Sequence, residues 1–220
     1  MSDKSNEKDA SVSGADQQKE ANREKTTALL KAVYQNGITA LRQFFPEVAG
    51  KVLNQERFGP VFVFQVKDEE QRVCACGFFL QELVAHFQSG KDPAQWMASF
   101  YFDLMDQGEA RPLPKPPAGE EETKALIDKT IVPHCIAAVR EEFAPEQVRA
   151  GLGIVPKQGP VFEAGFPGIK DGNNVCAVPL HVMMTHHLLN RDPAELVIQG
   201  LHSIREQQAA KNVKMDSPKG

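Results

Sequence analysis

Gly59-Pro60-Val61-Phe62 recurs as Gly159-Pro160-Val161-Phe162, and this pair of tetrapeptides determines the fold that we predict. The same separation of 100 residues aligns further identical residues without a gap: Cys76 with Cys176, Leu80 with Leu180, His86 with His186, and Asp92-Pro93-Ala94 with Asp192-Pro193-Ala194. These are ten identities within residues 59–105, whereas unrelated segments of that length would share about two or three. The sequence therefore predicts a tandem duplication.

The duplication sets the predicted organisation of the chain. Further upstream a separation of 98 aligns Ile38 with Ile136 and Phe45 with Phe143, so the two copies differ by a short gap in one loop. We expect a first repeat unit at 26–111, a Pro-rich acidic linker at 112–122 and a second unit at 123–209. The ends, 1–25 and 210–220, lack apolar residues that would offset the entropy of ordering, so we expect both tails to be disordered.

Each unit is predicted to have the order α-β-β-α-α. In the first unit, apolar residues recur at helical spacing over 28–45, and β-branched and aromatic residues form two strand-like runs at 61–66 and 72–78. Two helices follow, the second beginning at Asp92, since Asp at the N-cap and Pro at the next position suit a helix start. One hairpin is marginally stable alone, so we expect both hairpins to pair into a single antiparallel sheet covered by helices, an α+β fold. Two independent lobes are the alternative.

Composition and charge exclude several classes of function. The net charge is −4, which argues against nucleic acid as a partner because its binding relies on basic surfaces. No stretch approaches the ~20 apolar residues of a membrane-spanning helix, and the first 25 residues contain no apolar run. The four cysteines lack the spacing of a disulfide-rich scaffold, so we expect a cytoplasmic protein. We expect neither a membrane partner nor a cofactor.

Cys176, His181, His186 and His187 are the residues whose chemistry suggests a site. Thiolate and imidazole are ligands for zinc and similar metals, but His181 and His186 are five residues apart, which places them on different faces of a helix. Cys176 and His186 are also conceivable as a nucleophile and its base. Cys76 and His86 hold the matching places in the first unit, so the pair is equally well explained as part of the core.

Aromatic residues are concentrated in the first unit. At aligned positions the first unit has an aromatic residue where the second has a smaller or polar one, namely Phe64/Ala164, Phe78/Val178, Trp96/Leu196, Phe100/Gly200 and Phe102/His202. Either the first unit has the larger core, or these five aromatic residues form an interaction surface, and Gly200 would then leave room for a neighbouring chain or ligand. We therefore predict a non-enzymatic interaction or assembly protein, an adaptor or regulator that binds a protein partner or itself. The alternative is a small-molecule or metal-dependent enzyme that uses Cys176 and the nearby histidines.

Overall fold

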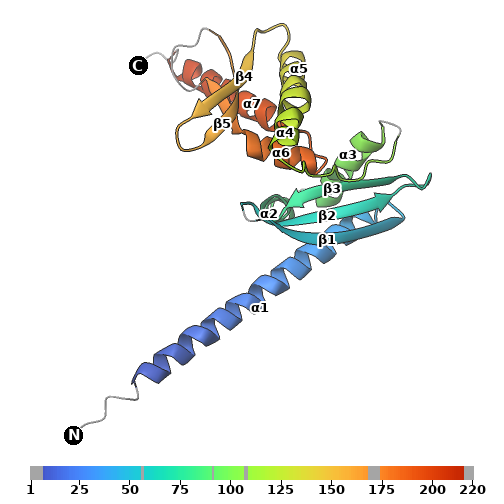
Figure 1. The fold of residues 1–220 in the computed structure, drawn as a ribbon, viewed down its shortest axis with the longest axis vertical. Helices are drawn as coiled ribbons and strands as arrows, with labels where there is room; N and C mark the ends of the chain where they lie inside the picture. Colours follow the sequence, from blue (N-terminus) through green and yellow to red (C-terminus); the bar gives the residue numbers. More distant parts are fainter. Residues whose placement is uncertain (1–6, 56, 91, 107–108, 168–173, 216–220) are drawn as a thin grey trace. The chain divides into compact units, whose positions relative to one another are not determined.

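The chain folds into two compact units, residues 1–112 (unit 1) and 113–220 (unit 2). The structure, a computed structural model, describes residues 7–55, 57–90, 92–106, 109–167 and 174–215, with side chains from residue 16 to residue 210. Each unit combines helices with one three-stranded antiparallel sheet, in the order β1-β2-β3 in unit 1 and β4-β5-β6 in unit 2 (Figure 1). The predicted α+β class is confirmed.

Unit 1 packs three helices and a sheet around an aromatic core. Its elements are α1 (Glu7–Leu41), β1 (Glu47–Gln55), β2 (Gly59–Lys67), β3 (Val73–Phe79), α2 (Leu80–Gln88) and α3 (Pro93–Met105). Alternate residues of β2 and β3 face the helices and are fully buried, among them Phe62, Phe64 and Phe78. The hydroxyl of Tyr101 on α3 donates a hydrogen bond of 2.9 Å to the Phe64 carbonyl, so the helix is fixed to the sheet by a polar contact as well as by burial.

Unit 2 has the same order of elements around a smaller core. Its elements are α4 (Glu120–Leu126), a π-helical turn (Ile127–Ile131), α5 (Val132–Glu142), β4 (Arg149–Val155), β5 (Gly159–Gly165), β6 (Val175–Pro179), α6 (Leu180–Leu188) and α7 (Pro193–Met215). The core is formed by Cys135 and Val139 of α5, Phe162 of β5, Met183 of α6 and Leu201 of α7.

The interruption of the first helix of unit 2 has a local cause. Pro133 occupies the second position of α5, directly after the π-helical turn. Proline has no N–H to donate to the carbonyl one turn earlier, so the regular hydrogen-bond ladder cannot continue through it. The regular helix α5 accordingly begins at Val132, next to this proline.

The sheets correct one part of the predicted fold. We expected two hairpins to share a single four-stranded sheet, but each hairpin pairs instead with a third strand of its own unit, β1 or β4. Neither strand has the composition typical of strands: β1 contains Ala49, Gly50 and Lys51, and β4 contains Gly151 and Gly153. The third strand supplies the pairing that an isolated hairpin lacks.

The registers of the two sheets correspond residue by residue. Ala49 pairs with Gln65 as Arg149 pairs with Gly165, and Val61 pairs with Phe79 as Val161 pairs with Pro179. In each case the second pair has the numbers of the first plus 100. Strand residues that are 100 positions apart in the sequence therefore occupy equivalent places in the two sheets.

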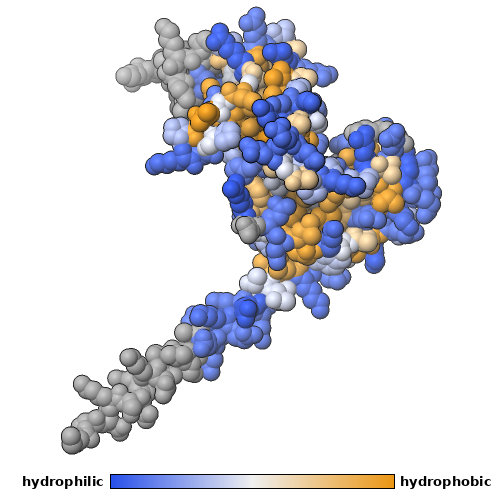
Figure 2. Space-filling model, in the orientation of Figure 1, coloured by the Kyte–Doolittle hydropathy of each residue, from blue (hydrophilic) through white to orange (hydrophobic). Residues whose placement is uncertain are grey.

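Helix α1 extends through most of the segment for which the composition predicted disorder. Residues 7–25 lie in this helix, and those from 16 to 28 are exposed and mostly polar (Figure 2). Ala, Glu, Lys and Gln are good helix formers, which explains a helix without tertiary contacts over this stretch. Residues 1–6 and 216–220 of the two predicted tails lie outside the described residues. The boundaries of the units and linker stay predictions.

Among the helices that the structure describes, none is both long and apolar enough to cross a membrane.

Candidate interaction surface

Two of the five aromatic residues predicted to form a surface lie in the core. Phe64 and Phe78 have no exposed area, because both point from the sheet toward the helices of unit 1. The prediction is corrected for these two residues. Trp96 and Phe100 on α3 are half-buried, with ring centroids 5.5 and 5.7 Å from that of Phe78, so they cover the core at its margin.

Phe102 is the predicted residue that does reach the surface. Its side chain is 44% exposed and meets Phe44, which is 41% exposed and follows the end of α1. The two rings stand edge to face, with centroids 6.0 Å apart. Phe45 lies beneath them, 5.5 Å from both Phe102 and the buried Tyr101. We call Phe44 and Phe102 the aromatic patch.

Phe44 is absent from the set predicted from the sequence. Helix periodicity could have identified the exposed half of the patch: Met97, Tyr101 and Met105 form the buried row of α3, which leaves Phe102 off the core face. This periodicity concerns Phe102 alone, and no signal in the sequence identifies Phe44 as its neighbour, because their contact depends on the packing of α3 beside the end of α1.

The equivalent place in unit 2 holds a polar pair. Phe44 aligns with Glu142 at the separation of 98, and Phe102 aligns with His202 at the separation of 100. His202 Nε2 lies 2.9 Å from Glu142 Oε1, and the His202 ring lies 4.9 Å from Phe143, the counterpart of Phe45. Both units thus have two partly exposed side chains above a buried phenylalanine, but the pair is apolar in unit 1 alone.

Cys176 has its thiol inside unit 2. An added Cβ at Gly200 on α7 would overlap Cys176 Sγ, so the thiol already fills the space beside this glycine. The space that we expected for a neighbouring chain or ligand is therefore occupied by the chain itself. Burial raises the pKa of the Cys176 thiol, and burial together with the charge of Asp192 raises that of Cys135 to about 12. Both groups are protonated at neutral pH and are poor nucleophiles.

The three histidines of α6 differ in their surroundings. His186 is buried, whereas His181 and His187 are half-buried. Burial, and the nearby His134, lower the pKa of His187. Within the described residues, no three His, Cys, Asp or Glu side chains are grouped so as to hold a metal ion.

Asp92 and Asp192 act as helix caps, as the sequence predicts. Asp92 Oδ1 accepts a hydrogen bond from the Ala94 N–H at 2.9 Å, and Asp192 Oδ1 accepts one from the Ala194 N–H at 2.8 Å. Asp192 Oδ1 also lies 2.8 Å from Nε2 of His134 on α5. Sequence reasoning missed His134, since 58 residues separate it from Asp192 and only the packing of α5 beside α7 brings them together.

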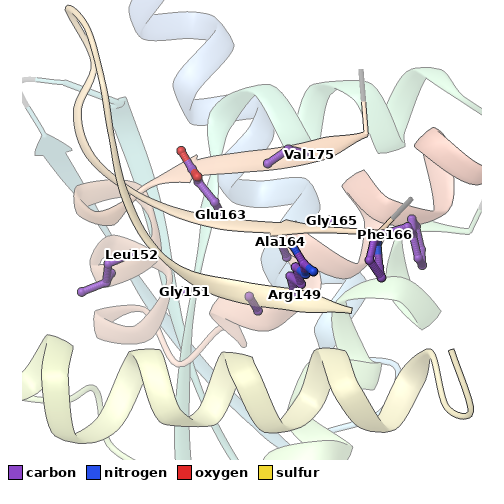
Figure 3. A pocket seen from close by; sticks show the side chains of 10 residues that line it. Arg149, Gly151, Leu152, Glu163, Ala164, Gly165, Phe166 and Val175 are labelled. Atoms are coloured by element: carbon purple, nitrogen blue, oxygen red, sulfur yellow. The ribbon is translucent and has the colours of Figure 1, made fainter. Parts of the chain in front are cut away.

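Each unit has an open hollow at one end of its sheet. In unit 2 a hollow of about 390 Å³ lies over β4 and β5, where Gly151 and Gly165 contribute no side chain (Figure 3). Arg149 and Glu163 line it with opposite charges. In unit 1 a hollow of about 310 Å³ lies at the corresponding strand ends, lined by residues that include Ala49 and Gln65.

A scan against protein-family models, a search of the curated proteins and a search of the solved structures each found no match for this chain.

Proposed function

We propose that this chain is a non-enzymatic interaction protein, an adaptor or assembly factor, and that the aromatic patch of Phe44 and Phe102 is where it contacts a protein partner. Apolar aromatic side chains gain free energy when a partner removes them from water, and they are common anchors of protein interfaces. The proposal narrows the surface expected from the sequence to its exposed members.

One comparison carries the proposal. Glu142 and His202 occupy the equivalent place in unit 2, above the equivalent phenylalanine, with a polar contact of 2.9 Å. A unit of this architecture is thus compatible with a hydrophilic pair at this position. The buried parts of Phe44 and Phe102 contribute to folding through their contacts with each other and with Phe45, but folding leaves more than two fifths of each ring in water. We infer that a partner covers this remaining apolar area.

The expected gain from covering the patch is moderate. The two side chains are 41% and 44% exposed, and a phenylalanine buries roughly 150–250 Å² when fully covered. At about 25 cal/mol per Å², covering both rings contributes roughly 4 kcal/mol before the costs of association. This is a useful anchor, but a complete interface needs further contacts around it.

The alternative function, an enzyme built on Cys176 and the nearby histidines, has weaker support. Catalytic thiols have lowered pKa values, whereas burial raises the pKa of Cys176. Asp192, the carboxylate nearest to these histidines in sequence, is engaged as a helix cap and with His134.

The test transfers the polar pair of unit 2 into unit 1. The double variant Phe44→Glu, Phe102→His removes two rings that are each more than half buried, so we expect its unfolding free energy to fall by about 2–5 kcal/mol, offset in part by the new Glu–His contact. Its circular dichroism spectrum and melting temperature therefore have to show that it is folded under the conditions of the binding assay. Cross-linking followed by affinity purification from the native cells should then show that proteins recovered with the wild type are lost with this variant.

Leu29→Ser is the matched control, because Leu29 is also apolar and 47% exposed but lies within α1, outside the aromatic patch. It should recover the same proteins as the wild type. Recovery of one unchanged set by all three chains would contradict the proposal.

We also propose that the two units arose by duplication of one gene segment and that the protein works in the cytoplasm. The duplication is supported by the ten identities and by the equal strand registers of the two sheets. The compartment is supported by four free cysteines, since a reducing environment keeps thiols unpaired.

A further inference from the structure

Strand β4 is an edge strand of the sheet in unit 2, and its surface is apolar. In the order β4-β5-β6 its only strand neighbour among the described residues is β5. Leu152 is 54% exposed and Ile154 is 83% exposed, although α5 packs beside this strand. An edge strand of this kind offers unpaired backbone groups to any further strand.

The pairing with β5 tells which backbone groups of β4 face outward. Ile154 lies opposite Pro160, which has no N–H, so these two residues cannot form a hydrogen-bonded pair. Pairs alternate along an antiparallel ladder, so Leu152 and Ala150 are likewise not bonded to β5. The N–H and C=O groups of Ala150, Leu152 and Ile154 therefore point to the open edge, which also carries the exposed side chains of Leu152 and Ile154.

The equivalent edge in unit 1 is protected. Lys51 and Asn54 of β1 are exposed at the positions where β4 has Gly151 and Ile154. Lysine on an edge strand is a common device against unwanted pairing, because a strand added there must accommodate its charge. In β4 both polar side chains are absent, and Arg149 at its first residue is the only charge of the strand.

We propose that β4 is a self-association site, at which two copies of the chain pair their β4 strands antiparallel about a two-fold axis at Leu152. The axis places Leu152 opposite Leu152 of the second copy and Ala150 opposite Ile154. The three outward-facing residues of each strand then exchange roughly six N–H···O bonds, and the two sheets join into one.

The charges of the strand fit a second copy in this register. The axis places Arg149 opposite Val155, so the two arginines stand at opposite ends of the ladder, about 20 Å apart. Self-pairing of β1 in the same register would bring two Lys51 side chains to within about 8 Å on one face. The dimer is thus specific to the edge of unit 2.

The interface is small. Each copy contributes one strand and two exposed side chains, so the surface area buried in the dimer lies at the lower end of the range found in specific complexes. We therefore expect a weak dimer with a Kd of about 10 μM, within the range of sedimentation measurements. This inference concerns a different unit and a different surface from the aromatic patch, so either can fail without the other.

A cross-linking experiment tests the position of the axis in the full chain. Hydrogen-bonded antiparallel partners have Cα atoms about 5.5 Å apart, a separation that a disulfide bridges. Leu152→Cys should form a disulfide-linked dimer under mild oxidation. Val175→Cys is the control, because Val175 is equally exposed at 53% but lies on β6. Equal cross-linking of the two variants would overturn the proposal.

Sedimentation of the full chain between about 1 and 200 μM tests the dimer itself. Gly151→Lys and Ile154→Asn transfer the protective residues of β1 to β4, and an added Cβ at Gly151 meets no atom within 4 Å, so folding is undisturbed. Together they should raise the Kd at least about tenfold, while Ile154→Val should leave it nearly unchanged. A wild type that stays at 24.3 kDa at every concentration, or a dimer insensitive to these substitutions, would overturn the inference.

Discussion

Gly200 on α7 and Cys176 on β6 provide a test of packing inside unit 2. We expect Gly200→Ala to lower the free energy of unfolding when the Cys176 thiol is present and to raise it when the thiol is removed. Gly200→Ala places a methyl group in α7 where Cys176 Sγ already lies. Overpacking of this kind costs about 1–3 kcal/mol, whereas replacing glycine by alanine inside a helix stabilises it by about 1 kcal/mol. In the wild-type background we expect the net result to be a loss of about 1 kcal/mol.

Removal of the thiol should reverse that sign. In the Cys176→Ala background only the Cβ of residue 176 remains near, 3.2 Å from the added methyl group, so most of the overpacking is relieved and Gly200→Ala should gain up to about 1 kcal/mol from helix propensity. The difference between the two backgrounds is the coupling energy of the pair, which we expect to be about 1–3 kcal/mol. Urea unfolding followed by circular dichroism, with each variant compared with its own parent, measures it.

Gly37→Ala supplies the control for this cycle. Gly37 lies in α1, where an added Cβ would meet the Phe64 ring, so the substitution should be destabilising by the same amount with or without Cys176. The reasoning is refuted if Gly200→Ala has equal effects in the two backgrounds, or if it stabilises the wild type.

Three further predictions concern unit 2. Asp192→Ala should lower the free energy of unfolding by about 0.5–2 kcal/mol, and Asp192→Asn by less, because Asn caps nearly as well and the exposed contact with His134 contributes little; thermal unfolding of both variants compares them, and an equal loss would contradict the capping role. The pKa of His187 is lowered in the folded state from its ordinary value of 6.5, so the unfolded chain takes up the proton first. Stability should therefore be complete above about pH 6.5 and decline as the pH falls below it, and His187→Gln should flatten this slope in urea titrations; an unchanged slope would exclude His187 as its cause. Alkylation followed by mass spectrometry at pH 8 should modify Cys176, which is partly exposed, well before Cys135, which is fully buried and has a pKa of about 12; the reverse order would contradict the burial of Cys135.

Local signals in the sequence were sufficient for the caps and most of the helices. Asp followed by Pro and Ala is a helix start whose physics lies within three residues, and both copies of it are caps in the structure. Pro133 likewise interrupts a helix through the hydrogen bond that it lacks. Such features need no knowledge of the rest of the fold.

Features that depend on pairing across the chain were missed. Strands β1 and β4 contain glycine or lysine at central positions, and only their partners β2 and β5 make them strands. The burial of Phe64 and the exposure of Phe102 follow from which side of the sheet or helix each residue occupies, and composition does not reveal this. The contact of His134 with Asp192 depends on the packing of two helices.

The segment around Arg111, after the end of α3, determines the shortest fragment in which unit 1 could be expressed alone. The Ala75 N–H donates to the Arg111 carbonyl and the Arg111 N–H donates to the Val73 carbonyl, each at 2.9 Å, so this segment closes the outer edge of β3. A fragment that stops at the end of α3 would expose this edge next to the buried Cys74 and invite aggregation. Expression of the first half of the chain alone therefore has to include Arg111, although no helix or strand of the unit extends that far.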